Sequence, residues 1–122
     1  LTEEVADTSL GLLLMTVREL SAAERHLRAG HWATSGPYPL SPSLRDRTVG
    51  IVGLGRIGMA IARRLDAMKV PVVYHSRRAV AGVPYRYYED LRAMASEDRP
   101  PRARSAGSER HPDQRWPGFD RG

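Results

Sequence analysis

Apolar residues recur at helical spacing near the start of the chain, and this pattern predicts a helix from about Glu3 to Glu19. Glu3 and Glu4 suit the positive end of its dipole. A second helix is expected at Ser21-Ala22-Ala23-Glu24, because this run has the Ser-x-x-Glu form of a capping box, and Gly30 can end that helix. The recurring apolar positions of the first helix are Val5, Leu10, Leu13, Leu14, Val17 and Leu20.

A connector rich in proline and glycine, residues 31–46, precedes a second apolar region. There the pattern predicts one strand at Thr48-Val49-Gly50-Ile51-Val52 and another at Val70-Pro71-Val72-Val73-Tyr74. Between them an apolar face recurs at helical spacing, so strand, helix and strand form one βαβ unit. The predicted fold class is therefore α/β, a partial Rossmann-type doubly wound parallel sheet. The apolar face consists of Ile57, Ala60, Ile61, Leu65 and Met68.

The run Gly53-Leu54-Gly55-Arg56-Ile57-Gly58 has the form GxGxxG and lies where the first strand turns into the helix. Dinucleotide binding requires the motif at this place. Gly53 allows the tight turn, Gly55 lets the backbone approach a pyrophosphate, and Gly58 lets the helix pack closely on the strand. The N–H groups around Arg56 and Ile57 would face the anion, with the helix dipole behind them. The alternative is an ordinary βα turn that contains three glycines.

His75-Ser76-Arg77-Arg78 follows the second strand, where an NAD-binding unit places a carboxylate for the adenosine ribose. This run has no carboxylate. Ser76 leaves room for a 2′-phosphate, and Arg77 and Arg78 could neutralise it with forked donors. We therefore expect NADP as the preferred cofactor and NAD as the alternative. A surface loop that is basic by chance is the other interpretation.

Composition divides the 122 residues into two unequal parts. All valine, isoleucine, leucine and methionine residues lie within residues 1–97, whereas residues 98–122 are rich in arginine and proline. Such a segment cannot bury enough surface to offset the entropy of ordering its backbone. We expect one domain at most, over residues 1–97, and a disordered tail over residues 98–122.

The net charge of +5 raises the question of a nucleic-acid partner. The basic residues are scattered rather than interleaved with aromatic ones, so we expect no such partner. The apolar run of residues 10–15 is too short to span a bilayer and follows acidic residues, so no membrane anchor or signal peptide is expected. The absence of cysteine excludes disulfides and thiolate metal sites and fits a soluble, cytoplasmic protein; we expect no metal.

Three runs taken in order resemble the D-isomer-specific 2-hydroxyacid dehydrogenases: residues 1–8, Gly30-His31-Trp32, and residues 48–58. The resemblance covers roughly residues 1–97. Ser76-Arg77-Arg78 resembles the glyoxylate and hydroxypyruvate reductase branch, which tends to prefer NADPH. The resemblance implies that residues 1–30 form interdomain helices at a homodimer interface and that residues 47–97 form the Rossmann βαβ unit. It also implies hydride transfer, in the complete enzyme, between a nicotinamide and C2 of a 2-oxo or 2-hydroxy acid.

The resembled family uses an arginine to bind the substrate carboxylate and a histidine, oriented by a glutamate, to handle the proton. None of the histidines lies in a matching motif, so we assign no catalytic residue and expect an NAD(P)-binding fragment that is inactive alone. We also expect this chain to lack the family's substrate-binding segment, which would precede Leu1, and its later strands. With so few strands, the apolar face of the first helix would lack its usual cover, so we expect a marginal chain that self-associates or looks partly unfolded. The histidines are His26, His31, His75 and His111, and the face is Leu10, Leu13, Leu14 and Val17.

A slip of the reading frame near residue 97 is our hypothesis for the tail. Codons that encode residues 111–119, read one nucleotide later, can encode Ile-Leu-Ile-Asn-Val-Gly-Arg-Gly-Ser. That run is close to the family's segment carrying the catalytic arginine. Since the interval before it is shorter than the family's, the hypothesis also allows for a deletion.

Three functional interpretations follow. The first is a fragment of a hydride-transferring enzyme acting on glyoxylate or hydroxypyruvate. The second is a stand-alone nucleotide-binding or regulatory module without turnover, and the third is a basic interaction protein. Binding of NADPH separates the first two from the third, and turnover of glyoxylate separates the first from the second. We favour the first.

Overall fold

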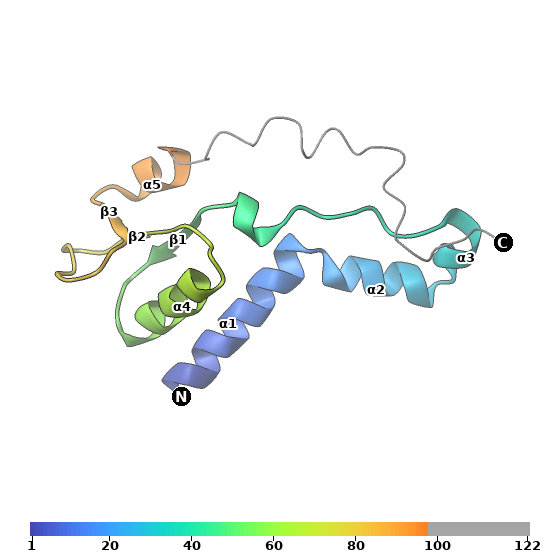
Figure 1. Ribbon diagram of the computed structural model, residues 1–122, viewed down its shortest axis with the longest axis horizontal. Coiled ribbons are helices and arrows are strands. Elements are labelled where there is room, and N and C mark those ends of the chain that lie inside the picture. Colours follow the sequence, from blue (N-terminus) through green and yellow to red (C-terminus); the bar gives the residue numbers. More distant parts are fainter. Residues whose placement is uncertain (98–122) are drawn as a thin grey trace.

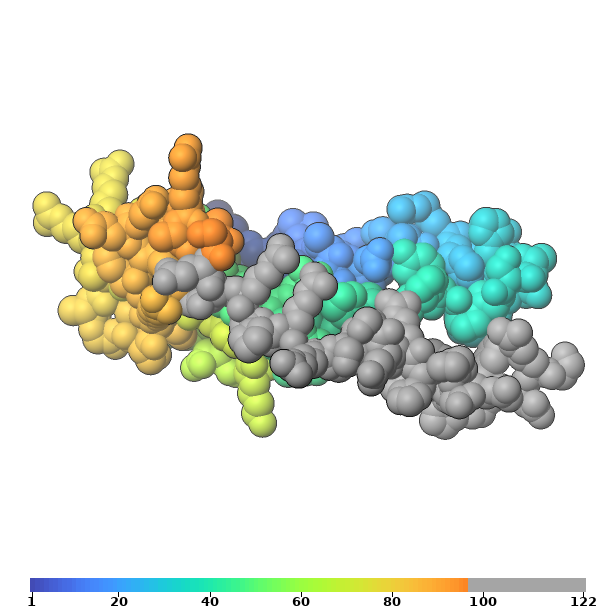
Figure 2. All heavy atoms as spheres, turned by 90° about the horizontal axis from the view of Figure 1, so that it is seen from above, coloured from blue at the N-terminus to red at the C-terminus, as the bar shows by residue number. Residues whose placement is uncertain are grey.

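The computed structural model describes residues 1–97, and the disorder and frame slip expected for residues 98–122 lie outside the described residues. The described chain is elongated (Figures 1 and 2). A small sheet and the helices packed on it form one end, and a helical arm extends from it. The candidate site belongs to the sheet end.

Helix α1 (Thr2–Val17) and helix α2 (Leu20–Arg28) confirm the two predicted N-terminal helices. The predicted capping box of the second helix is wrong, since Ser21 lies inside α2 and no side chain caps it. The chain turns earlier, at Glu19, which is the N-cap residue and has a left-handed φ of 52°. Gly30, with a φ of 78°, follows the last turn of α2 as predicted and leads into the short helix α3 (His31–Ser35). Among the described helices, none is long and apolar enough to cross a membrane.

Three parallel strands form the sheet: β1 (Val49–Val52), β2 (Val72–His75) and β3 (Arg86–Tyr88), in the order β1-β2-β3. Helix α4 (Arg56–Ala67) lies on one face and helix α5 (Leu91–Glu97) on the other (Figure 1). Helices on both faces of a parallel sheet confirm the predicted α/β class. The β3 strand and the α5 helix were not predicted from the sequence.

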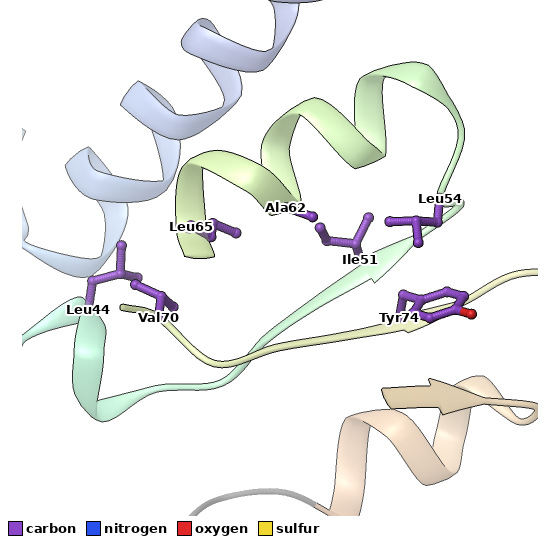
Figure 3. Packing of buried hydrophobic residues seen from close by; sticks show 7 residues of the cluster. All are labelled: Leu44, Ile51, Leu54, Ala62, Leu65, Val70 and Tyr74. Atoms are coloured by element: carbon purple, nitrogen blue, oxygen red, sulfur yellow. The ribbon is translucent and has the colours of Figure 1, made fainter. Parts of the chain in front are cut away.

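The core lies between α4, β1 and β2, and α1 covers its outer side (Figure 3). The apolar face of α1 packs, half-buried, against this cluster, so the expectation that it lacks cover is wrong. The face is covered because α1 lies beside α4. The two helices are joined by the Arg64 guanidinium, which donates to Asp7 Oδ1 over 2.8 Å and to Glu3 Oε2 over 2.5 Å. These two hydrogen bonds raise the pKa of Arg64. The cluster comprises Leu44 of the 3₁₀ turn Leu44–Asp46, with Ile51, Leu54, Ala62, Leu65, Val70 and Tyr74.

The turn from α4 into β2 is a Schellman motif. Val70 N donates to Leu65 O over 2.9 Å, and Lys69 N donates to Asp66 O over 2.9 Å. Lys69 takes the left-handed conformation, with a φ of 61°, at the position that glycine usually occupies. Because Val70 and Leu65 are both buried in the core, the turn fixes the distance between the end of α4 and the start of β2.

Candidate functional site

An open cleft of about 660 Å³ lies where β1 and β2 end. One wall is the glycine turn between β1 and α4, and the other is the loop that follows β2. The carboxyl ends of neighbouring parallel strands lie at the same sheet edge, which is where α/β proteins bind ligands. The lining residues are Val52, Gly53, Leu54, Gly55, His75, Ser76, Arg77, Arg78 and Val80.

Gly53 and Gly58 have the backbone roles predicted for them. Gly53 has a φ of 90°, a left-handed value that makes the tight turn, and its N–H donates to His75 O over 2.8 Å. A Cβ at Gly58 would come far inside contact distance of Gly53 O and within 3.3 Å of the Ile51 side chain. Helix α4 can therefore lie this close to β1 only because residue 58 is glycine.

Gly55 is the N-cap residue of α4 and lines the cleft. Its backbone is extended, and a Cβ built on it would meet nothing within 4 Å. The space in front of this helix end is thus empty of protein. The first N–H groups of a helix have no acceptor within it, so the end of α4 offers donors and a positive dipole to an anion.

Arg56 and Ile57 are the first residues of α4, but their side chains are exposed and do not line the cleft. A role for them rests on their backbone groups alone. Val52, Leu54, His75 and Val80 line the cleft although sequence reasoning gave them no site role. In the sequence these residues lie in the glycine motif, or within two residues of it or of the basic run. This proximity is the signal that could have identified them as cleft residues.

The basic loop places Arg77 and Arg78 at the cleft, and both side chains are exposed. Within residues 1–97, neither arginine forms an ion pair with a carboxylate. Ser76 Oγ donates to Arg78 O over 2.5 Å, so this hydroxyl closes the loop on itself. The neighbouring His75 Nδ1 lies 2.8 Å from Tyr88 O, and because a carbonyl only accepts, Nδ1 is the protonated nitrogen.

These features fit a dinucleotide. An open space in front of a helix N-terminus suits a pyrophosphate, and exposed guanidinium groups across the cleft suit a further phosphate. The apolar side chains of Val52, Leu54 and Val80 lie in the same lining.

Comparisons with known proteins agree with this geometry. Residues 10–98 match the family model of the D-isomer specific 2-hydroxyacid dehydrogenase, NAD binding domain. The chain is 39% identical over 97 residues to glyoxylate/hydroxypyruvate reductase HPR3 of Arabidopsis thaliana, covering 80% of this chain and 30% of the relative. It is 44% identical over 95 residues to glyoxylate/hydroxypyruvate reductase A HPR2 of the same plant, covering 78% and 30%.

Among solved structures, the NADPH-dependent glyoxylate/hydroxypyruvate reductase of Sinorhizobium meliloti, in complex with NADP and malonate, is 57% identical. The TM-score is 0.73, and the match covers 78% of this chain and 30% of that one. The chain thus spans about a third of the length of the relatives it matches. It belongs to the D-isomer-specific 2-hydroxyacid dehydrogenase family, with residues 10–98 corresponding to the NAD-binding domain.

Proposed function

We propose that the cleft binds NADP, in preference to NAD, for the reduction of a small 2-oxo acid such as glyoxylate or hydroxypyruvate. One observation carries the proposal: the glycine turn and the basic loop line the same cleft from opposite sides. Gly53 and Gly55, with the N–H groups of Arg56 and Ile57, would hold the pyrophosphate, and Gly58 would let α4 pack closely enough on β1 to present these groups. Arg77 and Arg78 would hold the 2′-phosphate, for which Ser76 leaves room.

NADP carries the chemistry in this proposal, since it supplies or takes up the hydride when bound. The residues of this chain bind and orient it. We assign no catalytic residue within residues 1–97 and propose that the chain does not turn over alone. A nucleotide-binding module without turnover is the alternative, and it would bind the cofactor equally well.

We also propose that two copies associate through residues 1–30. Helix α1 and its N-cap residue carry a second apolar row, formed by Leu1, Val5, Leu12 and Met15, all of which are exposed. The row lies apart from the half-buried face that packs on the core. Its spacing of four, seven and three residues keeps it on one side of the helix, as in a helix–helix interface.

The cofactor preference is tested by a triple variant, Ser76→Asp with Arg77→Ala and Arg78→Ala. The variant removes the cations and supplies a ribose acceptor, so the order of affinity for NADPH and NADH should reverse. The measurement is fluorescence titration of the parent and the variant with each cofactor. A loss of about tenfold or more is expected for NADPH, because charge-assisted hydrogen bonds are among the stronger ones. A parent chain that binds NADH more tightly than NADPH would contradict the proposal.

A further inference from the structure

The loop that carries the two arginines is fixed at both ends by tyrosine hydroxyl groups. Tyr87 Oη donates to Ser76 O over 3.0 Å at the start of the loop. At its end, Val80 N donates to Tyr74 Oη over 2.9 Å. Between these points the loop has no strand partner among the described residues, and the two phenols and the bond from Ser76 Oγ to Arg78 O hold its backbone.

The two tyrosines are themselves held firmly. Tyr74 and Tyr87 are register partners on adjacent strands, and their ring centroids lie 5.4 Å apart. Tyr74 is 1% exposed and belongs to the core cluster, with its hydroxyl oxygen at the end of the ring remote from Val70 (Figure 3). A buried phenol has only two side-chain torsions and needs a hydrogen-bond partner for its hydroxyl. Here the partner is the backbone of the arginine loop.

We infer that Tyr74 and Tyr87 are positioning residues for 2′-phosphate recognition. Their hydroxyl groups bond to the backbone of the loop from which both arginine side chains start. A loop already in its binding shape loses less conformational entropy when it takes up a phosphate, so affinity for that phosphate rises. NADH has no 2′-phosphate and would gain nothing from this ordering. The inference rests on the proposed function, because it assumes that the arginines face the adenosine end of the cofactor.

The test removes one hydroxyl and keeps the ring. In the full 122-residue chain, Tyr87→Phe deprives Ser76 O of its donor, and the dissociation constants of NADPH and NADH are measured by titration. We expect NADPH affinity to fall about three- to tenfold, the loss that one hydrogen bond accounts for, while NADH affinity stays within about twofold. Tyr85→Phe is the matched control: Tyr85 packs beside the core, and its hydroxyl forms no hydrogen bond within residues 1–97. Both affinities should stay unchanged in the control.

A second measurement reads the loop without any cofactor. In Tyr74→Phe the Val80 amide loses its acceptor, so its hydrogen exchange should become faster than in the parent and in Tyr85→Phe. Equal losses of NADPH and NADH affinity in Tyr87→Phe would mean a general structural role and overturn the inference. Unchanged exchange at Val80 would overturn it as well. A parent chain that binds neither cofactor would instead refute the proposed function, which keeps the two failures distinct.

Discussion

Gly55 and Gly58 are three residues apart in one motif, yet their side-chain hydrogens face different surroundings. The position of a Cβ at Gly58 is occupied by the backbone of the preceding turn, whereas that at Gly55 is open. One glycine therefore serves the packing of the fold, and the other leaves the cleft free. The motif combines a structural requirement with a binding requirement, and substitution can separate them.

Gly55→Val is expected to weaken NADPH binding by about tenfold or more, or roughly 1.4 kcal/mol, while helix content and melting temperature stay near those of the parent. The extended backbone of residue 55 accepts valine without strain, and the new side chain would occupy the space proposed for the pyrophosphate. Titration with NADPH and circular dichroism of the same sample check the two parts. Undiminished affinity would show that the pyrophosphate does not lie there.

At the scale of the element, helices α1 and α4 each contain a glycine within their span, and the two should respond oppositely to alanine. Gly11 is exposed, and a Cβ there would meet nothing within 4 Å. Gly58 is buried against the β1 turn. The helical backbone alone would favour alanine at both positions, so any difference must come from packing.

Gly11→Ala should raise the free energy of unfolding by about 0.5–1 kcal/mol, because alanine has the higher helix propensity. Gly58→Ala should lower it by about 1–3 kcal/mol, because α4 must move away from β1 to admit the methyl group. Urea unfolding followed by circular dichroism measures both. The same sign for both substitutions would contradict the close approach seen at Gly58.

For the whole molecule, large apolar side chains are exposed on several of the described elements. Val52, at the cleft end of β1, is 65% exposed, and Leu12 of α1 is 60% exposed. β1 pairs only with β2 among the described residues, so one edge of the sheet is open there. A small sheet with an open edge and an exposed apolar helix row buries a low share of its surface, so we expect a modest stability and a tendency to associate.

Leu12→Glu should weaken self-association, because it places a charge in the middle of the exposed row on α1. Sedimentation velocity over a concentration series measures the effect. Leu91→Glu is the control, since Leu91 is also exposed and lies on α5, on the far side of the sheet (Figure 1). Equal loss of association in both variants would indicate unspecific aggregation rather than pairing through α1.

Except for the short helix α3, which lies in the segment predicted as a connector, the order of helices and strands up to β2 could be predicted from the sequence, since it depends on local patterns. Helical and strand periodicity, the glycine turn and the basic run each lie within a short window, and those windows gave the α/β class and the two walls of the site. The cap of α2 could not be predicted reliably in this way, because Glu19 in a left-handed turn competes with a nearby Ser-x-x-Glu run. The cofactor assignments of the site residues stay predictions.

Only the tertiary structure decided the contacts between segments that are far apart in the chain. Arg64 meets Glu3 and Asp7 across more than fifty residues, where α1 packs its apolar face on the core. The β3 strand is short and tyrosine-rich, with no aliphatic residue, and it pairs only because β2 offers an edge. Tyr87 reaches Ser76 only through that pairing. Local periodicity reports which face of an element is apolar, but not which distant partner covers it, because that choice depends on the packing of the whole chain.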